Sequence, residues 1–373
     1  MTVTDGRDTT VMIDVDKLER FMTDVFIGAG VPEDDARICS DVLITSDKRG
    51  IDSHGIGRLK TIYIDRIRDG IQKPVTEFEI IKDGPGTALV DGHDGMGQVV
   101  GKRSMKMAIE KAKNCGIGMV AARNSTHYGI AGYYSLMAVG EGMIGITGTN
   151  ARPSVAPTFG VENMLGTNPL TFGIPTDEEF PFVLDCATSL TQRGKIEVYD
   201  REGKDVPPGW VIGSDGTTRT NSAAILKELV SGEAALTPLG GIGEEGAGYK
   251  GYGYSTVVEI LSAALQGGPF LKMLLGYSDG KKVPFHLGHF FIAIDISAFI
   301  DVDEFKKTAG AILRELRTSK KMPGTERIYT AGEKEYIAWT ERRKTGIPVN
   351  RRLQEEMKQM MSDLHITGYD FPL

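Results

Sequence analysis

The sequence predicts an α/β fold in which helical segments from both ends of the chain flank a central region of alternating strands and helices. Amphipathic helical patterns run from Val15 to Gly70, short β-rich runs alternate with helical stretches across residues 81–304, and charged helical patterns return across residues 305–373. Because the two ends share this texture, we expect them to pack together. We therefore predict a helical domain formed by residues 1–80 and 305–373, and an α/β domain formed by residues 81–304.

The helices of the N-terminal part are predicted from the spacing of apolar residues. Apolar side chains recur at helical spacing across residues 15–26, 38–43 and 56–67, and glycines follow each run. Pro32 and the three acids after it suit the first turn of the second helix, because proline is tolerated there and acids favour the positive end of the helix dipole. The chain therefore begins with three short helices that pack together.

The later elements are predicted in the same way. β-rich runs predict strands at residues 88–90, 118–121, 143–149, 182–185 and 290–296. Helical stretches bounded by glycine or asparagine are expected at residues 99–114, 132–142 and 255–266, followed by charged helices at residues 302–316, 333–345 and 350–364.

Composition restricts the classes of function. Hydrophobic residues make up 40% of the 373 positions and charged residues 25%, which is typical of a globular protein. The 43 basic and 50 acidic residues give a net charge of -7, so no overall positive field is present to hold nucleic acid or an anionic membrane. We expect a small-molecule ligand, held by local groups if it is an anion.

The cysteines and the N-terminal residues give information about the cellular compartment of the protein. Cys39, Cys115 and Cys186 are scattered and form no CxxC pair, which argues against a disulfide framework and a zinc site. The first ten residues are polar, and no apolar run approaches the ~18 residues that a transmembrane helix needs. We expect a cytoplasmic protein.

The first candidate site is the motif Asp52-Ser-His-Gly-Ile-Gly-Arg58 at the expected start of the third helix. If that helix begins at Ser53, His54 and Arg58 lie four residues apart on one face. An arginine can hold a carboxylate in a bidentate manner while a neighbouring histidine exchanges a proton with the adjacent oxygen, an arrangement that suits a 2-keto acid. The alternative is that Asp52 or Ser53 caps the helix and His54 is a surface residue.

The second candidate is His127, in the loop after the strand expected at residues 118–121. A histidine followed by glycines between a strand and a helix is well placed to face a ligand. A capping or core histidine is the alternative.

Two further polar segments are candidates for ligand binding. Asn150 begins a turn-rich stretch whose amide groups could bind substrate or cofactor, although such a stretch is first of all a turn signal. Asp185 ends an apolar strand, where a carboxylate can accept hydrogen bonds from ribose hydroxyls, and a helix-capping role is the alternative.

The glycine-rich segment before the helix expected at residues 255–266 offers a phosphate contact. Lys250 lies among glycines there, and a plain loop is the competing interpretation. Upstream, residues 241–246 match GxGxxG, but they follow no clear strand and contain two acids, so we reject a Rossmann loop. His286 and His289 lie three residues apart without an accompanying acid or cysteine cluster, which favours cofactor contact or packing over a metal site.

Six motifs in order resemble the malate/L-lactate dehydrogenase family, which is distinct from the Rossmann-type lactate and malate enzymes. The resemblance runs from about Leu18 to Ala338, and its motifs lie at residues 49–58, 125–129, 166–169, 185–189, 248–253 and 288–291. It implies a homodimer with a non-Rossmann α/β nicotinamide-binding domain, a helical domain from both chain ends that contributes catalytic residues, and an active site between the two.

The resemblance also implies residue roles. Ser53 and His54 match a hydroxyl and imidazole pair, Arg58 matches the anchor of the substrate carboxylate, and His127 matches a histidine proposed as the proton carrier. The choice between the two histidines stays open. The positions associated with the dinucleotide are Asn150 from the motif reading above and, from the family pattern, Asp185, Cys186, Ala187, Lys250 and His286.

The implied reaction is hydride transfer between NAD or NADP and a small 2-hydroxy acid, with malate first. Lactate, sulfolactate, ureidoglycolate and cyclic imino acids are the alternatives within the family, and a dinucleotide-binding protein without catalysis is the alternative outside it. The acidic segment at residues 240–247 favours NAD, whereas Arg193 favours NADP. Arg152 or Arg193 is the candidate for binding a second acid group of the substrate.

Overall fold

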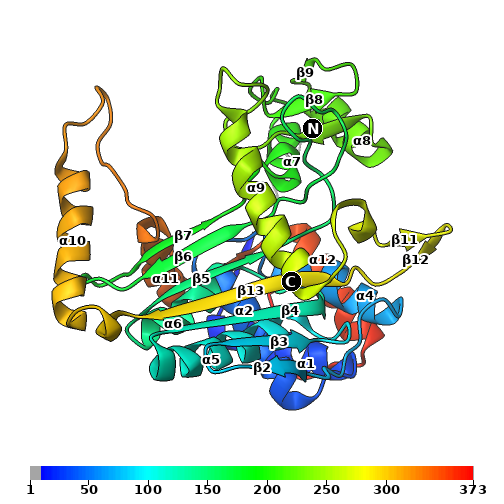
Figure 1. Ribbon diagram of the computed structural model, residues 1–373. Helices are drawn as coiled ribbons and strands as arrows, with labels where there is room; N and C mark the ends of the chain where they lie inside the picture. The colour runs from blue at the N-terminus through cyan, green and yellow to red at the C-terminus, as the bar shows by residue number, and fades with distance from the viewer. Residues whose placement is uncertain (1–9, 373) are drawn as a thin grey trace.

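A seven-stranded mixed sheet forms the centre of the molecule in the computed structural model, which describes residues 10–372 (Figure 1). The strand order is β2-β3-β4-β13-β5-β6-β7, and within this sheet only β3 and β4 pair in parallel. The strands are β2 (Glu79–Asp83), β3 (Thr87–Asp91), β4 (Ile117–Ser125), β5 (Met143–Thr149), β6 (Leu170–Ile174), β7 (Phe182–Cys186) and β13 (Leu287–Asp295). The predicted α/β fold is confirmed, and each of the five predicted strands overlaps a strand of this sheet.

Helices cover the two faces of the sheet unequally. One face packs against α5 (Gly97–Cys115) and α6 (Gly132–Gly140), and α9 (Gly248–Ser262) crosses the other. Strand glycines allow this close approach: a Cβ on Gly145 would lie 2.5 Å from the Ser135 carbonyl oxygen of α6, and a Cβ on Gly288 would lie 1.6 Å from the Ser262 carbonyl oxygen of α9. Helix α9 contacts β4, β13 and β5 on that face.

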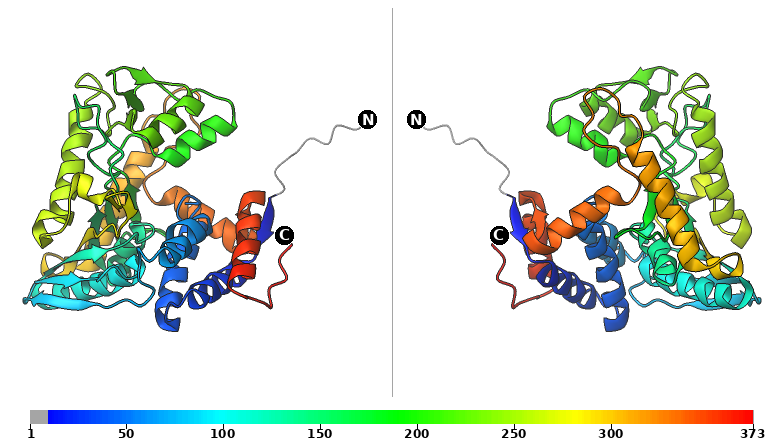
Figure 2. Two further views of the ribbon diagram at one scale, coloured as in Figure 1. Left: turned by 90° about the vertical axis from the view of Figure 1, so that its right-hand side faces the viewer. Right: turned by 90° about the vertical axis from the view of Figure 1, so that its left-hand side faces the viewer.

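Both ends of the chain contribute to one hydrophobic core beside the sheet (Figure 2). Phe21, Phe26 and Tyr63 of the N-terminal part and Val349 and Met357 of the C-terminal part are buried in it. The elements are β1 (Val11–Ile13), α1 (Val15–Gly28), α2 (Glu33–Lys48), α3 (Ile56–Arg58), the π-helix η1 (Leu59–Ile64), α4 (Asp65–Arg68), α11 (Glu333–Thr345), β14 (Ile347–Val349) and α12 (Arg351–Asp363), and β1 pairs with β14.

Helix α10 (Val302–Thr318) lies elsewhere, at the β7 edge of the sheet. Its Ile312, Leu313 and Leu316 line an apolar groove of ≈ 350 Å³ together with Ile174 and Phe182 of β6 and β7. The division of the chain into domains at residues 80 and 305 therefore stays a prediction.

A small lobe inserted between β7 and α9 was missed in the sequence analysis. Its three-stranded sheet is β10 (Ala234–Leu236), β8 (Val211–Gly213) and β9 (Thr218–Arg219), packed with α7 (Arg193–Arg201) and α8 (Ser222–Ser231) around a core of its own (Figure 2). Short connecting elements complete the chain: η2 (Ala264–Gln266), η3 (Leu271–Leu274), β11 (Tyr277–Ser278), β12 (Lys281–Lys282) and η4 (Ile296–Ala298).

Two expectations about the segment before α9 were wrong. The helix expected at residues 255–266 begins at Gly248, so its glycines are helical. Packing explains this despite the poor helix propensity of glycine, because a Cβ on Gly251 would lie 2.3 Å from the Leu239 carbonyl oxygen. The GxGxxG match at residues 241–246 also follows a strand, β10, but that strand belongs to the antiparallel sheet of the lobe and forms no βαβ unit.

Among the described helices, none is long and apolar enough to span a bilayer. The polar stretch that the sequence analysis noted at the N-terminus lies outside the described residues, except for Thr10.

Candidate active site

The structure brings together the two histidines that the sequence singled out. The rings of His54, before α3, and His127, after β4, lie 5.7 Å apart between centroids and are nearly parallel, with an interplanar angle of 18°. Both side chains are half-buried. Segments separated by more than seventy residues thus meet in one candidate site.

The segment before α3 has a different local geometry from the expected helix. Helix α3 begins at Ile56, after Gly55, so His54 and Arg58 do not lie on one helical face, and this expectation was wrong. Instead, Arg58 Nε donates to the Ser53 carbonyl oxygen at 2.5 Å, and Ser53 Oγ lies 2.8 Å from His54 Nδ1. The turn is closed by the Arg58 side chain, and Ser53, His54 and Arg58 therefore lie close together.

Tyr63 fixes the orientation of His127. Its hydroxyl lies 2.7 Å from His127 Nδ1, and the Gly129 N–H donates to the same nitrogen at 3.3 Å. Because Nδ1 accepts from a backbone amide, the neutral ring carries its hydrogen on Nε2, free to donate to a ligand oxygen. Tyr63 belongs to the π-helix η1, a rare element that is frequently found at functional sites.

Arg58 and Arg66 lie near this pair, and Arg152 lies near Arg66. Burial, and then the charges that include Arg66 and Arg58, lower the pKa of His127; burial, and then Arg152 and Arg58, lower the pKa of Arg66. Among residues 10–372, no carboxylate lies within ion-pair distance of any of the three guanidinium groups, although Arg58 and Arg66 are half-buried. A site with three cations and no internal counter-ion favours an anionic ligand of more than one charge.

Both histidines are neutral in the ligand-free protein at neutral pH. Burial, and next the Arg58 charge, lower the pKa of His54 to about 4. Burial lowers the pKa of His127 well below its usual range, and His54, Arg66 and Arg58 act in the same direction. A neutral imidazole can accept a proton from an alcohol or donate a hydrogen bond to a carbonyl oxygen.

Asp185 binds to the protein itself. Its Oδ2 accepts from the Gly132 N–H at 2.7 Å, at the start of α6, and its Oδ1 accepts from the Thr171 hydroxyl at 3.0 Å. This is the helix-capping role that the sequence analysis gave as the alternative. Direct contact with ribose hydroxyls therefore stays a prediction for Asp185, as it does for its half-buried neighbours Cys186 and Ala187.

Asn150 and His286 lie at the end of β13 nearest the histidines. Asn150 is buried, and its Oδ1 accepts from the Gly288 N–H at 2.9 Å. His286 Nδ1 lies 2.7 Å from Asp94 Oδ1, and that hydrogen bond raises the pKa of His286. His286 and Asp94 have φ of 52° and 61°, values that cost energy in non-glycine residues and cluster at functional sites. Phe285 then packs under Arg66, with the guanidinium 4.4 Å from the ring centroid.

The segments expected to bind the dinucleotide lie side by side. The Leu239 N–H donates to the Thr188 carbonyl oxygen at 2.9 Å, so the chain just after Asp185 runs beside the glycine-rich loop that leads into α9. Lys250 is exposed in the first turn of α9 and pairs with no carboxylate among the described residues. An unpaired cation at the N-terminus of a fifteen-residue helix suits a phosphate.

The other sequence candidates have different surroundings. Arg193 is exposed in the lobe and pairs with Glu197 at 3.0 Å, so its charge is partly balanced. His289 is buried, with Nδ1 2.7 Å from Thr149 Oγ1, and stacks on Tyr128 with ring centroids 4.4 Å apart, which is the packing role. Within residues 10–372, no three His, Cys, Asp or Glu side chains form a group that could hold a metal ion.

Comparisons with known proteins agree with this architecture. The family model described as malate/L-lactate dehydrogenase matches residues 13–358. The chain belongs to this family. It is 47% identical to the malate dehydrogenase of Pyrococcus horikoshii over 96% of this chain and 97% of that protein. It is 37% identical to the L-sulfolactate dehydrogenase of Methanocaldococcus jannaschii, over 95% and 97% respectively.

A solved structure shows the same fold in a family member. The crystal structure of malate dehydrogenase from Entamoeba histolytica superposes with a TM-score of 0.93 at 46% sequence identity, covering 98% of this chain and 100% of that one. The resemblance stated from the six motifs is therefore confirmed.

Sequence reasoning missed several residues of the site. Tyr63 was counted as part of an apolar helical stripe, and Arg66 was not considered. A signal was present, because Arg66 lies eight residues after Arg58, close to the same face of a regular helix. Asp94 gave no signal, since it meets His286 only because β3 pairs with β4 and β4 pairs with β13.

Proposed function

We propose that this dehydrogenase transfers hydride between a nicotinamide dinucleotide and a 2-hydroxy acid with two acid groups, malate being the first candidate. The observation that carries the proposal is the pair of neutral histidines beside Arg58 and Arg66, with Arg152 near Arg66 and none of the three arginines paired with a carboxylate among residues 10–372. A monocarboxylate such as lactate would leave more of this charge uncompensated. The names of the two relatives, malate and L-sulfolactate dehydrogenase, support a substrate with two acid groups.

Arg58 would bind the carboxylate next to the reacting carbon, as the family motif implies. Arg66 and Arg152 would bind the second acid group, because their guanidinium groups are near enough to interact and Arg66 is tied to the site through Tyr63 and Phe285. This assignment replaces Arg193, which pairs with Glu197 in the lobe.

His54 and His127 would share the proton chemistry. His127, with its hydrogen on Nε2, donates a hydrogen bond to the substrate oxygen. His54 is the stronger candidate for the proton carrier, because the Ser53 hydroxyl at Nδ1 can either donate or accept and therefore suits both protonation states. In the oxidative direction His54 takes the proton from the substrate hydroxyl, and in the reductive direction it returns the proton to the alkoxide.

The dinucleotide supplies or accepts the hydride when it is bound. Lys250 and the first turn of α9 would hold a phosphate, and Asn150, His286 and the backbone of residues 185–190 would line the rest of the nucleotide site. Glu244 and Glu245, in the loop before α9, disfavour an added 2'-phosphate, so NAD is the first candidate and NADP the second.

We also infer a homodimer in the cytoplasm. The face of the sheet crossed by α9 carries an aligned row of apolar side chains across four strands, from Ile292 of β13 through Ile146 and Phe172 to Leu184 of β7. Leu184 is 37% exposed, and a row of this kind needs a cover, for which a second copy of the chain is our candidate. The cytoplasm rests on the unpaired cysteines.

The test is oxidation of NADH, and separately of NADPH, by the purified protein with oxaloacetate, pyruvate, sulfopyruvate, 2-oxoglutarate and a cyclic imino acid. We expect turnover with oxaloacetate to exceed turnover with pyruvate by at least about tenfold, the size of one charge-assisted contact. Faster turnover with sulfopyruvate than with oxaloacetate would support a substrate with two acid groups, but it would make sulfolactate rather than malate the substrate. Absence of turnover in folded, cofactor-bound protein would reject the enzyme and leave a dinucleotide-binding protein.

A further inference from the structure

Arg342, near the end of α11, contacts Asp52, in the segment that carries Ser53 and His54, and also contacts the end of α2. Its guanidinium forms a two-pronged ion pair with the Asp52 carboxylate, with Nη2 3.0 Å from Oδ2 and Nη1 bonded to Oδ1. Nη1 also donates to the Asp47 carbonyl oxygen at 2.6 Å, at the end of α2. The Arg342 side chain is 17% exposed, whereas the Asp52 side chain is 56% exposed, so solvent screens this ion pair in part. Arg342 thus joins α11 to the end of α2 and to the residue directly before Ser53 and His54.

A buried carboxyl holds the same segment from the other side. Asp47 is 1% exposed, and its Oδ2 accepts from the Ile56 N–H at 2.8 Å, at the start of α3. Gly55 is pressed against this group, since a Cβ there would lie 1.8 Å from Asp47 Oδ1. Residues 52–56 are therefore fixed at both ends, with His54 between the two attachments.

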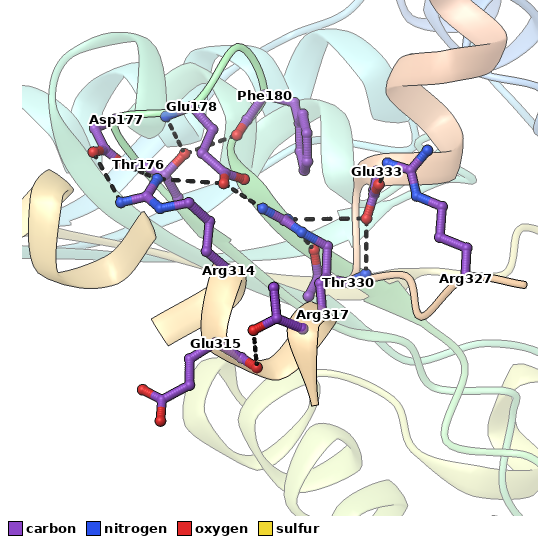
Figure 3. Close-up of polar contacts among 11 residues, drawn as sticks. Thr176, Asp177, Glu178, Phe180, Arg314, Glu315, Arg317, Arg327, Thr330 and Glu333 are labelled. Carbon is purple, nitrogen blue, oxygen red and sulfur yellow. Dashed lines mark hydrogen bonds and ion pairs between the residues drawn. The ribbon is translucent and has the colours of Figure 1, made fainter. Parts of the chain in front are cut away.

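The far end of α11 is anchored in turn (Figure 3). Glu333, its first residue, is 1% exposed, accepts from the Thr330 N–H at 3.1 Å and pairs with Arg327. Arg317 of α10 lies beside it and pairs with Glu178, in the turn between β6 and β7. Helix α11 is therefore held to the sheet edge at one end and to the catalytic segment at the other.

We propose that Arg342 is a positioning residue, which sets the geometry of His54 and Arg58 through Asp52; this inference rests on the proposed function. A bidentate guanidinium–carboxylate pair fixes orientation as well as distance. Displacement of a catalytic group by about 1 Å can cost about 10²-fold in rate. Because Arg342 lies behind the segment and touches no predicted substrate group, its loss should alter the site without altering cofactor binding.

The experiment compares Arg342→Ala, Arg342→Lys and Asp52→Asn with the matched control Arg343→Ala. Arg343 is the exposed neighbour, which packs over Trp339, with the guanidinium 4.7 Å from the ring centroid. Steady-state kcat and KM for the 2-keto acid, NADH affinity by fluorescence, and the melting temperature are measured for each variant. Oxalate, a stable dianion, is titrated calorimetrically into the NADH complex as a probe of Arg58 that needs no turnover.

For Arg342→Ala we expect kcat/KM to fall about 10- to 100-fold, with NADH affinity changed by less than about twofold and oxalate affinity reduced. Added guanidinium ion should restore part of the activity of Arg342→Ala only, and Arg343→Ala should equal the wild type. Asp52→Asn should reproduce the defect, and the double variant should be no worse than either single one, because both remove the same contact.

Two results would overturn the inference. One is an unchanged kcat/KM and oxalate affinity in Arg342→Ala with a lowered melting temperature, which would mean that Arg342 only stabilises the fold. The other is strictly additive losses in the double variant. If Arg342→Ala does not fold, Arg342→Lys and Asp52→Asn carry the test. If the wild type shows no turnover, the proposed function is rejected but the inference about Arg342 is still tested. The oxalate affinities of the wild type and the Arg342 variants can be compared without turnover.

Discussion

At the scale of single residues, the candidate site is characterised by arginines that form no ion pair with a carboxylate among the described residues. Tyr63 and the Gly129 N–H hold His127 in one orientation, while the Ser53 hydroxyl leaves His54 free to change its protonation state. Burial, assisted by the charge of Arg58, keeps both rings neutral in the ligand-free protein. The positive charge of the arginines therefore favours binding of the anionic substrate that we propose.

The pH profile of malate oxidation tests this electrostatic arrangement. The oxidation needs an unprotonated base, and the pKa of His54 in the free protein is about 4. Because kcat/KM reports on the free enzyme, it should stay flat between about pH 5.5 and 8, and no bend should lie near 6.5, the ordinary value for histidine. A tenfold fall per pH unit below about 6.5 would contradict the assignment. In His54→Gln, kcat should fall by about 10² to 10⁴.

Substitution of Arg66 tests how the second acid group is bound. In Arg66→Met, kcat/KM for oxaloacetate should fall about 10- to 100-fold while that for pyruvate changes by less than about threefold, because only the dianion uses this cation. Arg68→Gln is the matched control, since Arg68 is exposed and pairs with Asp363 at 3.0 Å. Equal losses for both substrates would show that Arg66 supports the fold or binds the group shared by the two acids.

At the scale of elements, the turn at residues 52–56, which carries Ser53 and His54, depends on the end of α2. Burial raises the pKa of Asp47 to about 8, and the nearby Asp52 also raises it, although the Ile56 N–H and Arg342 act against this. The folded protein thus retains a proton on Asp47 that the unfolded chain loses near pH 4. The free energy of unfolding must therefore fall as pH rises from about 4 to about 8, and the loss is complete above that range.

Asp47→Asn should remove this dependence, because an amide oxygen can still accept from Ile56 and carries no charge. In urea unfolding at about pH 5 and about pH 8, the variant should gain stability relative to the wild type as pH rises. A difference between the two proteins that is the same at both pH values would show that Asp47 titrates normally.

The sequence predicted elements well wherever local pattern decided them. Helices α1, α2, α5, α10, α11 and α12 and five of the seven strands of the central sheet, all except β2 and β6, follow from apolar spacing and glycine boundaries. Helix α9 was placed too late because its early glycines are required by contact with Leu239, and a contact between distant residues leaves no periodic signal. The lobe was missed because its strands have only two or three residues each.

In the candidate site, too, residues in local sequence motifs were predicted, whereas residues that act through contacts between distant parts of the chain were not. Ser53, His54, Arg58 and His127 were found through their motifs, and the structure places them together. Asp94 and Arg342 were not found, because each acts on a segment more than a hundred residues away in the chain. The helical face expected for His54 and Arg58 failed because Gly55 must fit against Asp47, which delays the start of α3.

At the scale of the whole molecule, the two faces of the central sheet are covered by helices to different extents. Helices α5 and α6 cover one face, whereas the other keeps apolar side chains between α9 and α10. Ile312 and Leu316 of α10 are 56% and 55% exposed at the border of this area. Apolar side chains exposed in this way are typical of interfaces, so we expect a second copy of the chain to cover this face and the groove beside α10.

Charge introduced into that face should therefore dissociate the proposed homodimer. Leu184→Glu and Ile312→Glu should each shift the sedimentation coefficient from that of a dimer to that of a monomer, because an interface must bury the new carboxylate without a partner. Val230→Glu is the matched control: Val230 is 70% exposed on α8, in the lobe and away from the sheet face. Circular dichroism verifies that each variant is folded. A wild type that sediments as a monomer would reject the dimer. A dimer that survives both substitutions would place its interface on another surface.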